Sequence, residues 1–158
     1  MSDEQGYRPR GRYFEEFSEG EMMITAGRTV TETDIVRFAG LSGDYNQIHT
    51  DAAYAAAGPF GERIAHGLLV LSIASGLAVQ TGIIEGTVLA FRELDWKFSR
   101  PVMIGDTVRV RIEITETKAL PRVGGGNVTM KVSVLNQEDK VVHRGHWVML
   151  VQSKNEDV

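Results

Sequence analysis

The chain has 158 residues, of which 42% are hydrophobic and 24% are charged. This is the composition of an ordinary globular protein, and the length fits one domain. The chain contains no cysteine, which excludes disulfides, thiolate nucleophiles, iron–sulfur clusters and cysteine-ligated zinc. Its net charge of −4 argues against a nucleic-acid partner.

We expect residues 1–11 to form a flexible tail, 12–152 a single domain and 153–158 a polar C-terminal tail. The first twelve residues contain no apolar run, so we expect no secretory signal and a cytoplasmic location. The run Gly67–Ile84 has no charged residue. It is slightly short for a membrane span and contains serine, threonine, glutamine and glycine, so we expect it to be buried within the protein instead.

The first half of the chain predicts one strand and three helices. The strand lies near residues 22–30. Thr31 opens a capping-box-like helix start with Asp34 in place of the usual glutamate, and Gly40 is expected to end this helix. A short helix is predicted over 51–57, and a helix that is apolar on all sides over 67–81.

The second half predicts strands near 88–98, 108–114, 128–134 and 141–151, in which apolar and polar residues alternate. Such alternation is typical of antiparallel strands with one covered face. The fold class is therefore α+β, with a four- or five-stranded antiparallel sheet. The simplest position for the apolar helix is across the covered face, which is a hot-dog arrangement. A single sheet leaves one side of such a helix open, so we expect a homodimer.

The densest polar cluster is Ser42–Asp51, between two predicted helices. Asp44 and His49 are five residues apart, so a regular helix or strand would point them in different directions. A loop that bends at Gly43, with Asn46 forming an Asx turn, brings them together. A carboxylate and an imidazole in one pocket can hold and activate a water. The alternative is that Asp44 only caps a turn and His49 is a surface residue.

The second feature is His66-Gly67, at the predicted start of the apolar helix. The first N–H groups of a helix lack internal partners, and a glycine lets a ligand approach them closely. Such a site stabilises a developing negative oxygen, as in a thioester that becomes an enolate. Tight helix packing is the alternative explanation of Gly67. Ser75 lies two turns further along the same face, where it can bond Asp44 or its own helix backbone.

Other chemistries find no support in the sequence. It has no nucleophile elbow, no phosphate-binding loop and no dinucleotide fingerprint. His143 and His146 would point apart in a strand and lack a metalloprotease context, so we expect no metal site there.

The segment Asp44-Tyr45-Asn46-Gln47-Ile48-His49 and the alanine-rich stretch after it resemble a known pattern. It is the D-x-N-P-x-H signature of MaoC-like dehydratases, the (R)-specific enoyl-CoA hydratases of the hydratase 2 family. The resemblance covers about residues 11–151 and includes three further stretches, 11–17, 65–67 and 98–106.

This resemblance implies a hot-dog fold, a homodimer or higher oligomer, and reversible syn addition of water to a trans-2-enoyl-CoA. The product is the (R)-3-hydroxyacyl-CoA. The resemblance gives the catalytic dyad as Asp44 and His49, and the oxyanion donor as the Gly67 amide. Supporting roles fall to Asn46, which orders the loop, to Ser75 beneath Asp44, and to His66. It implies no metal and no cofactor, since coenzyme A is part of the substrate.

Gln47 departs from the family pattern, because proline usually stands at this position and would stiffen the turn.

Arg92 shares the predicted covered face of its strand, and a buried arginine needs a partner. That partner is an acidic residue at an edge or interface, or a carboxylate on the acyl group. Arg63, Lys97 and Arg100 are candidates to bind the phosphates of coenzyme A.

Two other functions remain open at this stage. A hot-dog thioesterase would use a carboxylate to attack the thioester or to activate water there, and would release free thiol. A non-catalytic acyl-CoA-binding module would bind the thioester without chemistry.

Overall fold

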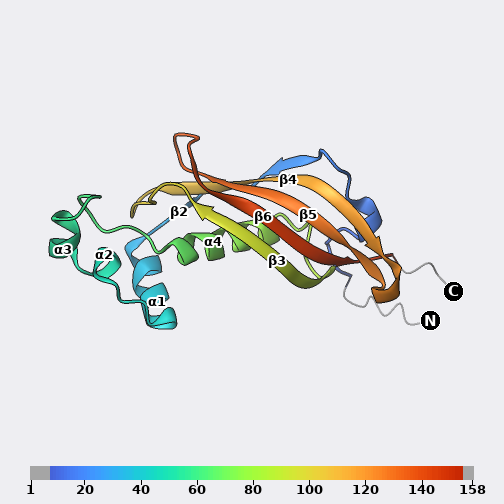
Figure 1. The fold of residues 1–158 in the computed structure, drawn as a ribbon, viewed down its shortest axis with the longest axis horizontal. Coiled ribbons are helices and arrows are strands. Elements are labelled where there is room, and N and C mark those ends of the chain that lie inside the picture. The colour runs from blue at the N-terminus through green and yellow to red at the C-terminus, as the bar shows by residue number, and fades with distance from the viewer. Residues whose placement is uncertain (1–7, 155–158) are drawn as a thin grey trace, which may run out of the picture.

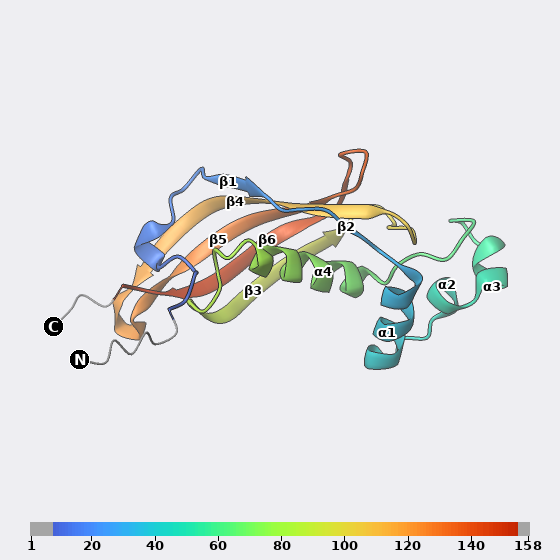
Figure 2. The same ribbon diagram turned by 180° about the vertical axis from the view of Figure 1, so that it is seen from behind.

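The computed structural model describes residues 8–154. An antiparallel sheet curves around helix α4 (Gly67–Gln80), and three short helices form a lobe beyond one end of the sheet (Figures 1 and 2). This confirms the predicted α+β class. The expected tails fall largely on residues 1–7 and 155–158, which lie outside the described residues. Gly11 and Ser153 are joined to the domain by backbone hydrogen bonds to Glu85 and Gly124.

The sheet has six strands in the described chain, in the order β1-β4-β5-β6-β3, with β2 also paired to β4. Their bounds are β1 Met22–Ile24, β2 Arg28–Thr29, β3 Val88–Phe98, β4 Thr107–Leu120, β5 Gly125–Leu135 and β6 Val141–Gln152. All neighbours run antiparallel, as the alternation predicted. Two short 3₁₀ helices are also present in the described residues. Helix η1 (Phe14–Glu16) precedes the sheet, and η2 (Pro121–Val123) joins β4 to β5.

The prediction of one continuous strand over 22–30 is wrong. The segment forms two short strands, because the ladder is interrupted at Thr25: its N–H still donates to the Val110 oxygen at 2.9 Å, but its carbonyl does not accept in return. Its hydroxyl accepts a hydrogen bond from the backbone N–H of Val110 at 2.9 Å. The sheet consequently has six strands rather than four or five.

Helix α4 lies along the concave face of the sheet, as the sequence predicted (Figure 2). The residues that face the sheet are buried and belong to one core with the inward side chains of β4, β5 and β6. These helical residues are Leu69, Val70, Ile73, Ala74, Leu77 and Ala78. Leu68 and Val79 on the other side remain exposed, so the sheet of one chain does not cover the whole helix.

Strand β3 departs from simple alternation at two bulges, between Val88 and Ala90 and between Phe91 and Glu93. Arg92 is the extra residue of the second bulge, and the bulge shifts the parity of the strand. Arg92 is therefore exposed, with its guanidinium 3.5 Å from the side-chain oxygen of Asn127. The expectation that Arg92 shares a covered face is wrong, and Arg92 is not among the residues that line the pocket described below.

Helix α1 (Glu32–Ser42) begins at the predicted capping box. The Thr31 hydroxyl accepts from the Asp34 N–H, and the Asp34 carboxylate accepts from the Thr31 N–H. The helix continues past Gly40, contrary to prediction, and ends at Gly43, whose φ of 75° is left-handed. Glycine in a helix interior costs stability but does not stop the helix, whereas a left-handed position strongly favours glycine.

Two further helices complete the lobe. Helix α3 (Ala52–Ala56) matches the predicted short helix and is capped by Asp51. Helix α2 (Gln47–Thr50) was not predicted, since its single turn has no apolar periodicity. None of the helices in residues 8–154 is both long and apolar enough to cross a membrane.

The register of β3 against β6 can be tested at Gly145. A Cβ atom there would lie 1.9 Å from the backbone oxygen of Asp95 and 2.8 Å from the Trp96 ring. We expect Gly145→Ala to lower the free energy of unfolding by about 3 kcal/mol, as overpacking does. Gly40→Ala is the control. Its Cβ meets only the Tyr45 hydroxyl at 3.7 Å, so it should stabilise the helix by up to about 1 kcal/mol. Equal urea midpoints for Gly145→Ala and wild type would contradict the register.

Candidate active site

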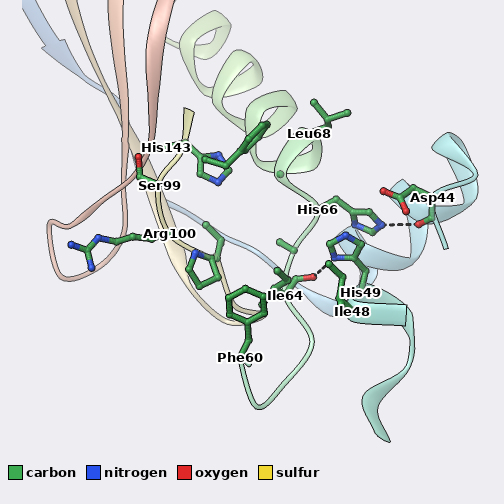
Figure 3. Close-up of a pocket in the computed structure, with 15 residues that line it drawn as sticks. Asp44, Ile48, His49, Phe60, Ile64, His66, Leu68, Ser99, Arg100 and His143 are labelled. Carbon is green, nitrogen blue, oxygen red and sulfur yellow. Dashed lines mark hydrogen bonds between the residues drawn. The ribbon is translucent and has the colours of Figure 1, made fainter. Parts of the chain in front are cut away.

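A pocket of about 490 Å³ lies between the lobe, the start of α4 and the end of β3 (Figure 3). Asp44, His49 and His66 line one side of it, and His143 faces them across the cavity. The remaining wall is mostly apolar and includes Ile48, Phe60, Ile64, Leu68, Phe98 and Val102. The pocket therefore combines a small polar group with an apolar space, as small-molecule sites do.

The loop that carries Asp44 is held by hydrogen bonds among its own residues. The Asp44 carboxylate accepts from the Asn46 N–H at 3.1 Å, and the Asn46 side chain accepts from the Ile48 N–H at 3.3 Å. Asn46 is thus the N-cap of α2. Its ordering role, which the Asx-turn argument anticipated, is visible in these contacts.

Gln47 is the first residue of α2, a position that proline also accepts. The preceding Asn46 has φ −53° and ψ 134°. This extended conformation is the one that a residue before proline is restricted to. The loop therefore keeps the shape that a proline would impose, although Gln47 replaces it.

His49 is buried, and its Nδ1–H donates to the backbone oxygen of Ile64 at 2.7 Å. Because a carbonyl only accepts, Nδ1 carries the proton and Nε2 keeps its lone pair when the ring is neutral. Burial lowers the pKa of His49 below its ordinary value of 6.5, and the neighbouring His66 lowers it further. The bond to Ile64 and the charge of Asp44 act in the opposite direction. His49 is therefore suited to accept a proton near neutral pH.

His66 connects the two members of the predicted dyad. Its Nε2–H donates to the backbone oxygen of Asp44 at 2.9 Å, and its ring stacks on His49 with centroids 3.9 Å apart. His66 is also the N-cap residue of α4 and is only 2% exposed. A fixed position of this ring consequently fixes Asp44 and His49 relative to the helix start.

The structure brings Asp44 and His49 together. The carboxylate of Asp44 and ring nitrogens of His49 and His66 all lie within 4.8 Å of one another. A carboxylate accepts hydrogen bonds through both oxygens, and Nε2 of a neutral His49 accepts through its lone pair. A water molecule has two hydrogens to donate, so it can bridge this pair and keep its oxygen lone pairs for a substrate.

The same three residues are the group in residues 8–154 with the spacing to hold a metal ion. Lone pairs of imidazole lie in the ring plane, and the His49 and His66 rings stack with only 26° between their planes. The lone pairs of His49 and His66 therefore lie in two nearly parallel planes whose ring centroids are 3.9 Å apart, and cannot both be aimed well at one ion between the rings. This geometry does not favour zinc, whose ligands converge at about 2.0–2.1 Å. That the site uses no metal stays a prediction.

Gly67 is the first residue of α4, and its N–H has no acceptor among the described residues. It lines the pocket beside His66. A Cβ atom at this position would lie 2.6 Å from the Phe98 ring, so glycine is needed for packing as well. The pocket and the helix start thus share a wall, and that wall contains one backbone N–H without an acceptor in the described residues.

Two other expected residues, Ser75 and Arg63, do not take part in the polar group of the pocket. Ser75 is half-buried on α4, outside the pocket lining, and no hydrogen bond joins it to Asp44 in the described structure. Two turns of helix separate Ser75 from Gly67, so Ser75 lies too far along the helix to reach the loop that carries Asp44.

Arg63 is held by Glu32 through Nη1 to Oε1 at 2.9 Å and Nη2 to Oε2 at 2.5 Å. This ion pair raises the pKa of Arg63 and lowers the pKa of Glu32.

His143 is a pocket residue that the sequence analysis treated only as part of a histidine pair. It is 2% exposed, and the ring packs edge-on against Trp96 and Phe98. Burial lowers its pKa from 6.5 to about 4. His143 is four residues before Trp147 in β6, so the two side chains lie on the same, covered face of the strand. This spacing is the signal in the sequence that could have placed His143 inside the protein. The expected divergence of the pair is confirmed, since His146 is exposed and bonds Asp95 at 3.0 Å.

The sequence pattern of the MaoC like domain matches residues 16–137. The chain is similar to protein MaoC of Klebsiella aerogenes, 41% identical over 110 residues, which are 70% of this chain and 32% of that protein. It is 34% identical to the 3-hydroxybutyryl-CoA dehydratase of Methylorubrum extorquens, over 91% of this chain and 87% of that enzyme. It is 40% identical to the (R)-specific enoyl-CoA hydratase of Rhodospirillum rubrum, over 65% of this chain and 69% of that enzyme.

Solved structures agree with the fold. An Archaeoglobus protein described as a monoamine oxidase regulatory protein superposes with a TM-score of 0.85 at 38% identity, over 91% of this chain and 96% of that one. A Mycobacterium tuberculosis protein described as a double hot-dog fold superposes with a TM-score of 0.82 at 20% identity, over 96% of this chain and 47% of that one. The predicted hot-dog fold is confirmed.

The buried state of His143 predicts a pH-dependent stability. The unfolded chain binds a proton at His143 below pH 6.5, whereas the folded chain stays neutral there down to about pH 4. Protons therefore favour unfolding in this window, and stability is lost as the pH falls. We expect the free energy of unfolding to drop by about 3 kcal/mol between pH 7 and pH 4 through this residue.

Urea unfolding of wild type and His143→Gln across this pH range measures the effect. The stability of the wild type should fall more steeply than that of the variant, because glutamine has no proton to bind. Parallel profiles for the two proteins would contradict a neutral buried His143.

Proposed function

The chain belongs to the MaoC-like dehydratase family, and we propose that it adds water reversibly to a trans-2-enoyl-CoA to give the (R)-3-hydroxyacyl-CoA. The observation that carries the proposal is the convergence of Asp44 and His49 beside the free Gly67 N–H in one pocket. Relatives named as a 3-hydroxybutyryl-CoA dehydratase and an (R)-specific enoyl-CoA hydratase support the substrate class. A coenzyme A thioester substrate accords with a cytoplasmic location.

In this mechanism, the thioester oxygen accepts a hydrogen bond from the Gly67 N–H at the start of α4. The free N–H groups and dipole of the helix start favour the negative charge that the oxygen gains. This interaction withdraws electrons from C3 of the enoyl group and makes it electrophilic. It is strongest for the enolate, so it stabilises the transition state more than the substrate.

The bridging water lies between the Asp44 carboxylate and His49 Nε2, both of which accept its hydrogens. As the water oxygen bonds to C3, the dyad takes one proton and the thioester becomes an enolate. The same proton then returns to C2, which restores the thioester. Because one water supplies both the hydroxyl and the proton from one side of the plane, the addition is syn. Dehydration follows the same steps in reverse.

The thioesterase alternative places the attack at the thioester carbon instead of C3. It requires the carboxylate to lie next to the carbonyl carbon and leads to free thiol. The binding-module alternative requires no chemistry at all. A buried histidine with one ring nitrogen held by a carbonyl and the other free is an arrangement for proton transfer, and favours the hydratase over a binding module.

We propose that the working unit is a homodimer. The outer edge of β3 has no partner strand in residues 8–154, and exposed apolar side chains lie along it. They include Leu89, Phe91, Leu94 and Phe98. A long apolar edge strand invites pairing with another chain, and the uncovered side of α4 carries exposed Leu68 and Val79. A second copy of this chain that covers both surfaces would remove the exposure.

The dyad can be tested by substitution. We expect Asp44→Asn and His49→Gln each to lower kcat for crotonyl-CoA hydration at least about 100-fold, the usual loss when an acid–base group is removed. The loss of enoyl-thioester absorbance measures the rate, and a thiol reagent detects release of coenzyme A. Circular dichroism checks that the variants are folded.

A matched pair elsewhere serves as control. Asp95 and His146 are also a carboxylate and an imidazole in contact, with Oδ2 and Nδ1 3.0 Å apart, but they lie exposed on the outer face of the sheet. Asp95→Asn and His146→Gln should leave hydration unchanged. Near wild-type rates for both dyad variants would overturn the assignment, and stoichiometric thiol release would favour the thioesterase.

The dimer is tested by one substitution on β3. Leu94 is 46% exposed beside the free edge, so Leu94→Lys should place a charge in the interface and shift the chain to monomers. Light scattering after size-exclusion chromatography gives the molar mass of both proteins. A wild-type chain that is monomeric at the same concentration would contradict the dimer.

A further inference from the structure

A second hollow, of about 630 Å³, adjoins the catalytic pocket where β3 ends and β6 begins. It is lined by Ser99, Arg100, Lys140, Val141 and Arg144. Ser99 and Arg100 belong to the wall of both spaces. Figure 3 shows the guanidinium of Arg100 pointing away from Asp44 and His49. The hollow therefore lies beside the pocket without containing the proposed catalytic residues.

The backbone that carries these side chains is well held. The N–H groups of Ser99 and Arg100 both donate to the Val142 oxygen at 2.9 Å. Lys140 ends the turn between β5 and β6, where its N–H donates to the Asn136 side chain at 3.0 Å. Arg144 lies in β6, directly opposite Lys97 of β3. Two strand ends and a closed turn thus bring several basic side chains to one place.

The positive charge of this hollow is largely uncompensated. Of the basic residues that line the hollow, Arg100 and Arg144 form no side-chain hydrogen bond or ion pair within residues 8–154, whereas Lys140 pairs with Glu138. Lys97, which lies outside the lining but opposite Arg144, is also unpaired in this part of the chain. The nearby Asp139 is taken by Arg109. Elsewhere in the described chain, Arg12, Arg28 and Arg63 are each matched by a carboxylate, while Arg111 and Arg122 have no ion pair but do not line this hollow. Unpaired cations around a hollow attract an anionic ligand.

We infer that this hollow binds the phosphate groups of coenzyme A, an assignment that rests on the proposed function. Coenzyme A carries its thioester at one end of a long arm and a diphosphate and 3′-phosphate at the other. With the thioester at Gly67, an arm that leaves the pocket past Ser99 and Arg100 would enter the hollow, because these two residues line both spaces. Guanidinium groups bind phosphate oxygens in pairs, so Arg100 and Arg144 are the principal contacts.

This assignment separates the three basic residues that the sequence offered for the phosphates. Arg100 lines the hollow and Lys97 stands opposite Arg144 in the register, so both are retained. Arg63 is excluded, because both of its terminal nitrogens bond Glu32. The sequence could not single out Arg144 and Lys140, since they come from a different strand and turn.

The test measures binding of coenzyme A itself by titration calorimetry, so that it does not depend on catalysis. We expect the double variant Arg100→Gln/Arg144→Gln to raise the Kd for coenzyme A about tenfold or more, which corresponds to about 1.4 kcal/mol. The control is Arg111→Gln/Arg122→Gln, which removes the same charge from exposed positions on β4 and η2. Its Kd should stay within about twofold of wild type, a change of less than half a kcal/mol.

A second measurement compares two thioesters that differ only in the phosphates and nucleotide. For crotonyl-CoA, kcat/KM should fall with the double variant as the Kd rises. For crotonyl-pantetheine, which has no phosphate, kcat/KM should be the same in the variant and in wild type. Equal losses for both thioesters would show that the arginines act on the pocket rather than on phosphate, and would overturn the inference.

The two proposals fail in different ways. If wild type hydrates neither thioester but its coenzyme A affinity depends on Arg100 and Arg144, the hydratase function is wrong and the phosphate site stands. If hydration proceeds but the double variant binds coenzyme A as tightly as wild type, the phosphate site is wrong. A wild-type chain that does not bind coenzyme A also overturns it.

Discussion

The hydrogen bond from His66 Nε2 to the backbone oxygen of Asp44 is the contact on which the site depends. It ties the lobe, which projects beyond the sheet, to the first turn of α4. The same ring stacks on His49, so one buried side chain positions both members of the dyad. Without it, Asp44 would stand on an exposed loop held only by local bonds to Asn46 and Ser42. A partly buried hydrogen bond of this kind has a modest net energy but a strong geometric effect.

The core of the fold determines where this contact can form. Helix α4 lies against the sheet through six buried side chains, so its first turn has a fixed position at the end of β3. There the Phe98 ring packs on Gly67 and closes one wall of the pocket. The hot-dog packing therefore does more than bury apolar surface, because it places a free helix N–H, an apolar wall and two strand ends around one space. The basic hollow at Arg100 and Arg144 uses the same strand ends on the other side.

Much of this arrangement could be predicted from the sequence. Period-two alternation gave the long strands, uniform apolarity gave the buried helix, and the odd spacing of Asp44 and His49 indicated a loop. The bulge at Arg92 could not be predicted, since it depends on how β3 twists against β6. Likewise, α2 has too few residues for periodicity. The role of Ser75 was inferred from its helix face and from the family resemblance, and neither gives the distance from that residue to the loop. His143 was overlooked because it was considered with His146 rather than with Trp147.

The central claim is that one water, held by Asp44 and His49, adds to C3 of an enoyl thioester whose oxygen is bound at Gly67. The most direct measurement is the fate of isotopes when crotonyl-CoA is converted in deuterated, ¹⁸O-labelled water. The account predicts (3R)-hydroxybutyryl-CoA with ¹⁸O on C3 and one deuterium on C2 on the same face, as read by NMR and mass spectrometry. Label in a free carboxylate, or deuterium on the opposite face, would contradict it.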